Sequence, residues 1–325
     1  ELQRIHKFKC RDALRLEHSQ PVLHESASLV SGQKTTEANA HARGVAAHVR
    51  GLEAAQRRPQ LGHAAGQELP VVGVEGGLAD PVDQALDAAD RTFLFKTAIK
   101  DIIHRTGQHA TFMGKPWNDE GGSGFHLHFS VTDLKGENKM HDGKGNLSDT
   151  ARLMIAGVTA NAAALTALTN PTVNAFKRLG PDTLAPYRAN WGYDNRSCMV
   201  RVPPERGSGT RLEVRVGDGA ANPYLVIAGI LAAALDGITR KLDCPADAVG
   251  MAYDNEDAEI LPATFSDALD ALEGNAHLHD RLAPELVGVF LAMKRDEIAR
   301  YEAAVPDPST REVTDWEITE YAACY

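Results

Sequence analysis

Residues 211–215, with the sequence Arg-Leu-Glu-Val-Arg, constrain this chain most strongly. If they form a β-strand, alternate side chains lie on opposite faces. One face is then apolar and suited to a core, and it consists of Leu212, Val214 and Val216. The opposite face carries one carboxylate between two guanidiniums, and it consists of Arg211, Glu213 and Arg215. This strand alone leaves two interpretations open. It is either a surface salt-bridge ladder that adds little stability, or a site whose carboxylate holds a metal ion and whose arginines hold anions.

A second candidate strand, residues 125–130, follows the glycine-rich loop 121–124 and alternates in the same way. Its apolar face consists of Phe125, Leu127 and Phe129, and its polar face of His126, His128 and Ser130. A neutral imidazole is a common metal ligand and can also donate a hydrogen bond to a phosphate. Together with Glu213, the histidines would suit Mg²⁺ or Mn²⁺, and zinc is less expected because no thiolate accompanies them. An ordinary polar strand face is the simpler alternative.

Arginines are concentrated in one part of an acidic chain. Seven lie between residues 178 and 215, and six of them are candidates for binding anions: Arg178, Arg196, Arg201, Arg206, Arg211 and Arg215. Guanidinium groups bind carboxylates and phosphates bidentately. Arg196 and Arg201 are five residues apart, and an odd spacing places two residues of one strand on opposite faces. Either Arg196 therefore lies in the turn before the strand, or only one of the two faces the site. The chain has no P-loop, dinucleotide fingerprint or nucleophile elbow. Metal ligands, arginines and glycine loops together indicate phosphoryl transfer.

The composition excludes several other classes. A formal net charge of −10 over 325 residues disfavours non-specific binding to nucleic acid or to an anionic membrane. There is no run of about 20 apolar residues and no cationic-then-apolar leader, so neither a membrane span nor a secretory signal is expected. Four cysteines lie far apart without a CxxC pair, which indicates a reducing, cytoplasmic location.

The chain divides near residue 80. Residues 1–80 contain one aromatic residue, Phe8, and six of the thirteen histidines, and their apolar periodicity is weak. We therefore expect them either to be poorly ordered or to fold only against another partner. Helices are predicted beyond this point at residues 82–105, 149–168, 223–242, 266–273 and 284–304, and a last one opens with the capping box of residues 314–317. Strands are predicted at residues 109–115, 125–130, 198–203 and 211–216.

Five segments, taken in order, resemble the motifs of the glutamine synthetase catalytic domain. They are Gly122-Ser-Gly-Phe-His126-Leu-His128, Asn170-Pro-Thr-Val-Asn174-Ala-Phe-Lys-Arg178-Leu, Asn195-Arg-Ser197, Arg211-Leu-Glu-Val-Arg215 and Ala221-Asn-Pro-Tyr224. Five motifs in the right order are a specific signal. The resemblance implies an α+β fold, with an antiparallel sheet flanked by helices. It also implies two regions: an atypical N-terminal segment at residues 1–80, and a catalytic domain at residues 81–325.

The resemblance further implies an activity and its site. The activity is the ATP-dependent joining of glutamate to ammonia or a small amine through γ-glutamyl phosphate, with ATP and Mg²⁺ or Mn²⁺ as cofactors. His126 and Glu213 resemble metal ligands. Residues that resemble nucleotide-binding positions are His128, Ser130, Arg201 and Arg211. Those that resemble substrate-binding positions are Gly122, Arg178, Arg196 and Arg215, and those that resemble catalytic positions are Arg196, Arg201 and Arg215.

Three features depart from the family pattern. Where the family has a glutamate in a mobile flap, this chain has Leu184, which suits the alkyl part of a larger amine such as a polyamine or ethanolamine. Position 121 is Gly where many members have Asn. Residues 1–80 do not resemble the family's β-grasp domain, and its other metal carboxylates are not identified there. The alternative function is therefore a catalytically inactive or truncated member that acts as a binding or assembly protein. The family arrangement implies a homo-oligomeric ring.

Overall fold

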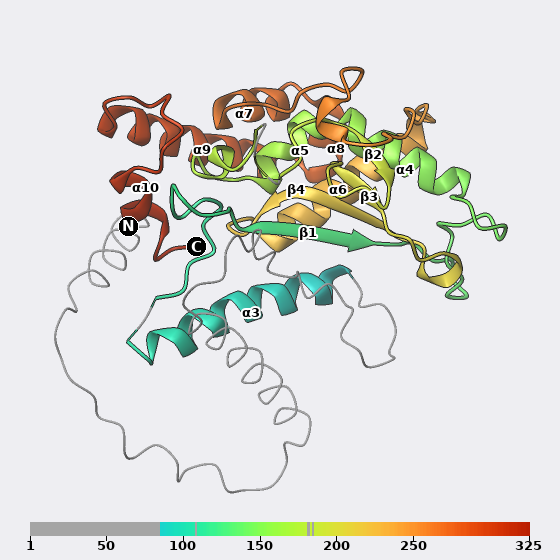
Figure 1. Ribbon diagram of the computed structural model, residues 1–325, viewed down its shortest axis with the longest axis horizontal. Helices are drawn as coiled ribbons and strands as arrows, with labels where there is room; N and C mark the ends of the chain where they lie inside the picture. The colour runs from blue at the N-terminus through green and yellow to red at the C-terminus, as the bar shows by residue number, and fades with distance from the viewer. Residues whose placement is uncertain (1–84, 108, 181–182, 184) are drawn as a thin grey trace, which may run out of the picture. The chain divides into compact units, whose positions relative to one another are not determined.

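The computed structural model describes residues 85–325 except 108, 181, 182 and 184 (Figure 1). The predictions for residues 1–80 and for Leu184 therefore lie outside the described residues. All described residues belong to the second of two compact units, residues 65–325. The helices are α3 (Ala85–His104), α4 (Asp149–Ala160), α5 (Ala162–Thr169), α6 (Pro223–Arg240), α7 (Phe265–Glu273), α8 (Ala276–Leu282), α9 (Pro284–Ala304) and α10 (Asp315–Tyr321), with 3-10 turns η1 (Ala175–Lys177), η2 (Gly207–Gly209) and η3 (Ala252–Asp254). The strands are β1 (Gly124–Phe129), β2 (Trp191–Tyr193), β3 (Val200–Val202) and β4 (Leu212–Asp218).

The four described strands form one sheet in the order β1-β4-β3-β2. β4 pairs antiparallel with β1 on one side and with β3 on the other, which confirms the predicted α+β class and its antiparallel sheet. The short pair β2 and β3 is parallel. The chain turns back between them through Asp194, which has a positive φ of 45°. The strand predicted at residues 125–130 is β1, and that predicted at 211–216 is β4.

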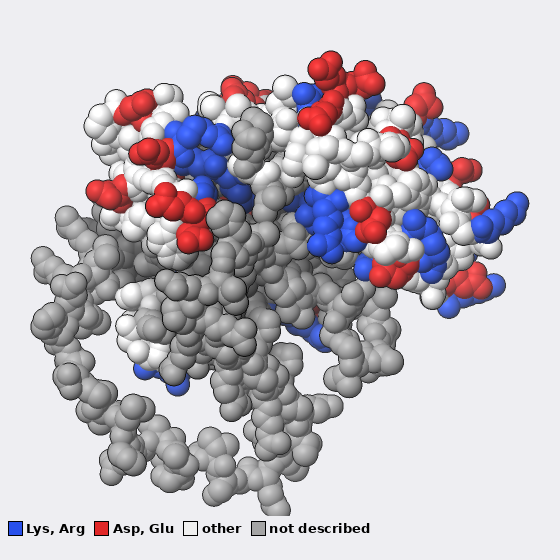
Figure 2. All heavy atoms as spheres, viewed as in Figure 1, with Lys and Arg blue, Asp and Glu red and all other residues white. Residues whose placement is uncertain are grey.

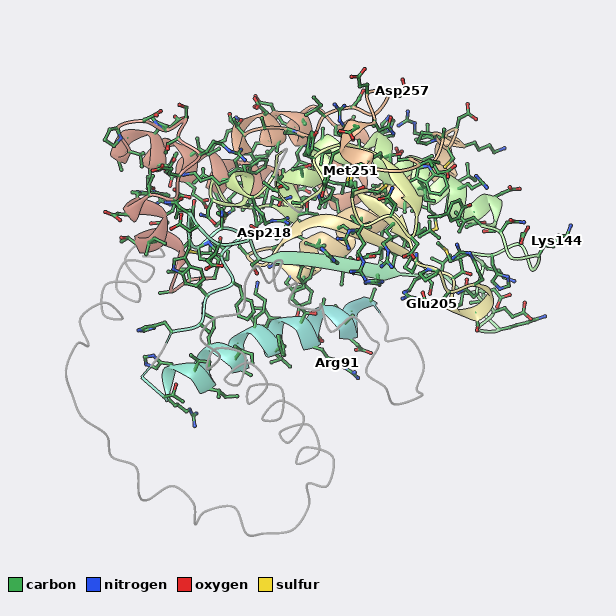
Figure 3. All side chains as sticks on the ribbon, in the orientation of Figure 1. Arg91, Lys144, Glu205, Asp218, Met251 and Asp257 are labelled. Carbon is green, nitrogen blue, oxygen red and sulfur yellow. The ribbon has the colours of Figure 1, made fainter. Side chains whose placement is uncertain are left out.

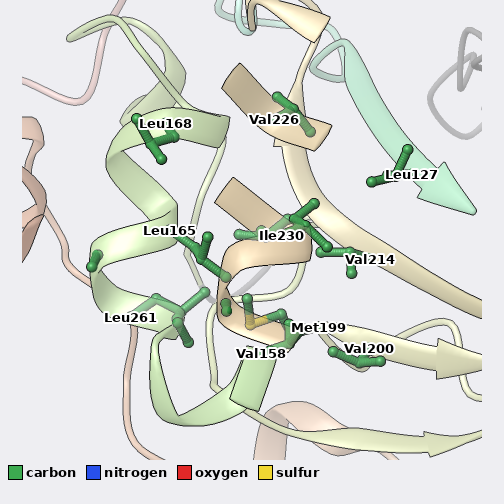
Figure 4. Close-up of a cluster of buried hydrophobic side chains, with 14 of the residues drawn as sticks. Leu127, Val158, Leu165, Leu168, Met199, Val200, Val214, Val226, Ile230 and Leu261 are labelled. Carbon is green, nitrogen blue, oxygen red and sulfur yellow. The ribbon is translucent and has the colours of Figure 1, made fainter. Parts of the chain in front are cut away.

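The core lies between one face of this sheet and the helices α4, α5 and α6 (Figure 4). The predicted apolar face of β4 is almost completely buried, with Leu212 and Val216 at 0% exposure and Val214 at 2%. Leu165 of α5 and Ile230 of α6 belong to the same buried cluster. The alternation of apolar side chains therefore decided which face of β4 points inward.

Residues 149–168 form two helices where we predicted one. α4 and α5 meet at Asn161 with a bend of 75°. The amide of Asn161 donates to the carbonyl of Gly157 at 2.9 Å and to Asp236 of α6 at 3.1 Å, so its side chain competes for backbone bonds at the break. A Cβ at Gly157 would lie 2.6 Å from the nitrogen of Gly237, which shows how closely α4 and α6 approach. The prediction of a single helix was wrong, and one of the bonds at the break is made to a partner from α6, which the local sequence does not show.

The strand predicted at residues 109–115 was also wrong, because these residues form no strand. The backbone N–H of Phe112 instead donates to the carbonyl of Tyr325 at 3.0 Å, and that of Lys115 donates to the side chain of Asn174 at 2.7 Å. The segment thus hydrogen-bonds to single groups that lie far away in the sequence.

The helix ends follow the predicted signals. Asn222 caps α6 by accepting from the backbone N–H groups of Tyr224 and Leu225. Thr314 and Glu317 form the predicted capping box of α10. Among the described helices, α6 is long and apolar enough to cross a membrane, and the bent pair α4 and α5 passes the same test together. Half of the tested window of α6 is buried, and α6 packs against α4, so it forms part of the core.

Candidate functional site

The polar faces of β1 and β4 form one surface, because the two strands pair antiparallel with His128 opposite Glu213. Figure 2 shows basic and acidic side chains next to one another over this sheet. Glu205 and Asp218, labelled in Figure 3, lie toward its opposite ends. The predicted residues His126, His128, Glu213 and Arg215 therefore lie on neighbouring strands. The two histidines are not simply a solvated strand face.

The carboxylate of Glu213 is the centre of this surface, and its side chain is only 3% exposed. Its Oε1 accepts from Nη1 of Arg215 at 2.6 Å and lies 3.1 Å from Nδ1 of His126. Its Oε2 accepts from Nη1 of Arg201 at 2.7 Å. Burial alone would raise the pKa of Glu213, but its hydrogen bond to His126 and the charge of Arg215 outweigh it and hold the pKa well below its usual range.

Arg201 is placed by the sheet, because it lies directly opposite Glu213 in the β3–β4 pairing. Its Nε and Nη2 donate to Oδ1 of Asp194 at 3.1 and 2.5 Å. Although burial lowers the pKa of Arg201, its bonds to the two carboxylates raise it overall. Glu213 thus lies between Arg215 and Arg201, whereas the strand pattern suggested Arg215 and Arg211. The difference arises because β3 pairs beside β4 and presents Arg201 across the ladder.

Arg196 lies in the turn that precedes β3, which is the first of the two alternatives left by its odd spacing. Its side chain is exposed, and its carbonyl accepts from Nε of Arg215 at 3.1 Å. The turn that carries Arg196 is therefore joined to Arg215 on β4.

Arg178 closes one end of the surface and is 6% exposed. Its Nη2 donates to the carbonyls of Val216 and Gly217, both at 2.7 Å. Burial lowers the pKa of Arg178 against the opposing charge of Asp218, and the charge of Arg215 lowers it further. Its Nε is buried and has no hydrogen-bond partner among the described residues. A Cβ at Gly122 would lie 2.5 Å from Cδ of Arg178, so this glycine packs directly on the arginine stem.

Arg211 lies at the other end of β4. Its Nε donates to Nδ1 of His128 at 3.2 Å, and its Nη1 donates to Glu205 at 3.1 Å. Ser130 follows β1 directly and is half-buried. Two of the predicted nucleotide residues, His128 and Arg211, are thus in contact.

Two charged residues near this end of the sheet, Asp218 and Lys96, were not predicted from the sequence. Asp218 is 0% exposed, and burial raises its pKa to about 6 against the opposing charges of Arg178 and Lys96. Burial also lowers the pKa of Lys96 to about 8, and its Nζ donates to the carbonyl of Gly219 at 2.7 Å. Asp218 falls on the apolar side of the β4 alternation, and this mismatch was the one available signal.

The donor set fits a hard metal ion in part. His126 and Glu213 lie side by side. Among the described residues, however, no three His, Cys, Asp or Glu side chains form a group suited to a metal. Mg²⁺ commonly binds through one or two carboxylates and keeps waters and substrate phosphates as its other ligands. These two residues therefore suit a cation that arrives with a nucleotide.

Comparison with known proteins identifies the class. Residues 76–321 match the family described as "Glutamine synthetase, catalytic domain". The chain therefore belongs to the glutamine synthetase catalytic-domain family, as its motifs indicated.

Relatives and solved structures agree with this. The chain is 40% identical over 249 residues to a glutamine synthetase of Thermococcus kodakarensis, covering 74% of this chain and 56% of that protein. It is 39% identical over 249 residues to the glutamine synthetase of Halobacterium salinarum, with 74% and 53% covered. A solved structure titled "GmaS/ADP complex-Conformation 1" is 39% identical, has a TM-score of 0.64, and covers 73% of this chain and 54% of its own. The chain spans about half the length of the curated relatives it matches.

Proposed function

We propose that this site binds ATP and glutamate, and joins the γ-carboxylate of glutamate to ammonia or a small amine. The supporting observation is the order of charged groups along β4. Arg211 lies at one end, Glu213 and Arg215 lie in the middle, and Arg178 bonds to the carbonyls of Val216 and Gly217 at the other end. Residues 211 to 217 of a strand span roughly 20 Å, which is long enough for a nucleoside triphosphate and an amino acid bound end to end.

The nucleotide end consists of His128, Ser130 and Arg211 in this proposal. Arg211 already contacts His128, so a nucleotide would meet two linked donors. His126 and Glu213 would hold Mg²⁺ or Mn²⁺, which would offset phosphate charge when bound. A solved relative whose title names an ADP complex supports the nucleotide assignment.

The glutamate end consists of Gly122, Arg178 and Arg215. The guanidinium of Arg178 is held rigidly by two backbone carbonyls, so it is preorganised to bind a carboxylate. Gly122 lacks a side chain that would collide with the Arg178 stem. The glycine therefore allows substrate backbone atoms to approach this arginine.

The reaction has two balanced steps. An oxygen of the glutamate γ-carboxylate attacks the γ-phosphorus of ATP, the bond to the β-phosphate oxygen breaks, and ADP leaves. The amine nitrogen then attacks the acyl carbon, phosphate leaves with the oxygen, and the amine loses a proton to solvent. Arg196, Arg201 and Arg215 carry positive charge to the place where negative charge develops on the transferring phosphoryl group.

The acceptor amine is the finer part of the proposal. A leucine at position 184 can neither bind ammonium through charge nor take its proton, and it suits an alkyl chain. We therefore expect a primary amine such as putrescine or ethanolamine to be used at least as well as ammonia. Rates with the three acceptors at equal concentration of free amine test this, and strict dependence on ammonia would remove the Leu184 argument.

Substitution of Glu213 tests the activity itself. ADP release should require glutamate and Mg²⁺ or Mn²⁺, and Glu213→Ala should reduce it by a factor of roughly 100 or more, because it removes the carboxylate that would hold the metal ion and that accepts from Arg201 and Arg215. Glu320→Ala is a matched control, since this carboxylate pairs with Arg300 on the surface at 2.7 Å. Full activity of Glu213→Ala would contradict the proposed metal role.

One observation favours a second candidate, a binding or assembly protein without catalysis. Within the described residues, no three His, Cys, Asp or Glu side chains form a group suited to a metal ion, and the carboxylate of Glu213 already bonds to two arginines. Isothermal titration of ATP with Mn²⁺ separates the two candidates. Binding together with glutamate-dependent ADP release supports the ligase, whereas binding without turnover supports the second function.

We further propose a homo-oligomeric ring and a cytoplasmic location. The family membership supports the first, and the spacing of the four cysteines supports the second. Sedimentation of the purified chain would measure the assembly.

A further inference from the structure

A buried carboxylate of the C-terminal helix α10 lies beside the loop that carries Arg178. Glu317 is 0% exposed. Its Oε2 accepts from Nζ of Lys177 at 2.5 Å and from the hydroxyl of Thr314 at 2.8 Å. Its Oε1 accepts from the amide of Asn174 at 2.8 Å. One carboxylate from the end of the chain thus holds two side chains of the loop at residues 170–179.

The bond to Lys177 acts next to Arg178 in the chain. The ammonium of Lys177 is enclosed, since it also donates to the carbonyl of Glu312 at 2.5 Å and to the hydroxyl of Tyr301 at 3.3 Å. Lys177 ends the turn η1, and Arg178 follows with its guanidinium bonded to β4. Because the two residues are consecutive, fixing Lys177 fixes the backbone from which Arg178 extends.

The bond to Asn174 acts on the segment that leads to Gly122. Asn174 makes a paired contact with the backbone of Lys115, since its Oδ1 accepts from Lys115 N–H and its Nδ2 donates to Lys115 C=O, both at 2.7 Å. The side chain of Lys115 in turn bonds to the carbonyls of Asn118 and Glu120. These bonds order the loop that leads to Gly122, the residue that packs on the Arg178 stem.

A third contact joins the same two parts of the chain. Nη1 of Arg311 donates to the carbonyl of Phe176 at 3.0 Å, and its Nη2 donates to that of Leu179 at 2.6 Å. We call Arg311, Thr314 and Glu317 the C-terminal clamp. It holds the loop by its backbone and by two side chains.

We propose that Glu317 is a positioning residue. Its carboxylate fixes the loop that carries Arg178 relative to the segment that carries Gly122, and these two residues form the glutamate subsite. This rests on the proposed function of Arg178 and Gly122. Glu317 does not touch the substrate in this proposal and acts only through Lys177 and Asn174. A charged pair at this depth is strongly sensitive to the loss of one partner.

The test compares Glu317→Gln with Glu297→Gln in the full chain. Glu297 is a matched control, because it is also buried and bonds to a lysine, Lys294 at 2.8 Å, and to Tyr321 of α10 at 2.6 Å, but it does not contact the loop. Glu317→Gln should raise the KM for glutamate about tenfold or more while the KM for ATP changes less than about twofold. It should also speed amide hydrogen exchange at residues 174–180. Glu297→Gln should change neither.

Each result either supports or overturns the proposed role of Glu317. Unchanged exchange at residues 174–180 overturns the clamp, and faster exchange with an unchanged KM for glutamate overturns the positioning role. A wild-type chain without glutamate-dependent ADP release refutes the proposed function instead, and then the exchange measurement alone decides on the clamp. If Glu317→Gln does not fold, Lys177→Met removes the same pair from the other side and takes its place.

Discussion

Substituting Gly122 tests the glutamate end of the site most directly. The Cβ of Gly122→Ala would lie 2.5 Å from Cδ of Arg178 and 2.7 Å from the carbonyl oxygen of Gly114. Neither neighbour yields easily, because one is backbone and the other is a buried stem whose guanidinium is bonded to β4. Overpacking of this kind costs about 1–3 kcal/mol. If the strain is relieved by displacing Arg178, the affinity for glutamate falls by a factor of about 5–150.

The assay pairs thermal unfolding with initial rates at varied glutamate and varied ATP. Gly122→Ala should raise the KM for glutamate within that range and leave the KM for ATP near its wild-type value. Gly288→Ala on α9 is the control, because no atom lies within 4 Å of its added Cβ. It should stabilise the chain by roughly 0.5–1 kcal/mol and leave both constants unchanged. A wild-type KM for glutamate in Gly122→Ala, or equal rises in both constants, would refute the reasoning.

Two further predictions concern stability. Burial raises the pKa of Asp218 from its ordinary 3.8 to about 6, so the folded state binds more protons there than the unfolded state, and stability falls by about 3 kcal/mol as the pH rises through this window. Asp218→Asn should remove that fall, and denaturant unfolding that shows the same decline in both proteins would contradict it. Gly157→Ala should lower the unfolding free energy by about 1–3 kcal/mol or more, because its Cβ meets the carbonyl of Ala233 and would lie 2.6 Å from the nitrogen of Gly237. An unchanged urea midpoint would show that α4 and α6 can separate freely.

Much of the fold and part of the site could be predicted from local patterns. Alternation placed Leu127 and Val214 in the core, and it placed His126 and Glu213 on the opposite face of the same sheet. The capping box of α10 could also be predicted, since Thr314 and Glu317 are three residues apart in the sequence. These features depend on residues that are close together in the chain, so the order of the residues is enough to predict them.

The partners of the buried charges could not be predicted in this way. Glu213 pairs with Arg201 rather than Arg211, because β3 lies beside β4 and puts Arg201 opposite it. Asn161, at the break between α4 and α5, bonds to Asp236, which lies 75 residues away in the chain. No periodicity in either segment records such a contact.

Glu317 shows the division most clearly. Its capping role could be predicted from local sequence, because the groups it satisfies at Thr314 lie in the same turn. Its bonds to Lys177 and Asn174 could not, because these residues lie about 140 positions earlier in the chain and meet it only in the folded protein. A buried charge must find a partner, but the chain's three-dimensional path determines which partner is within reach.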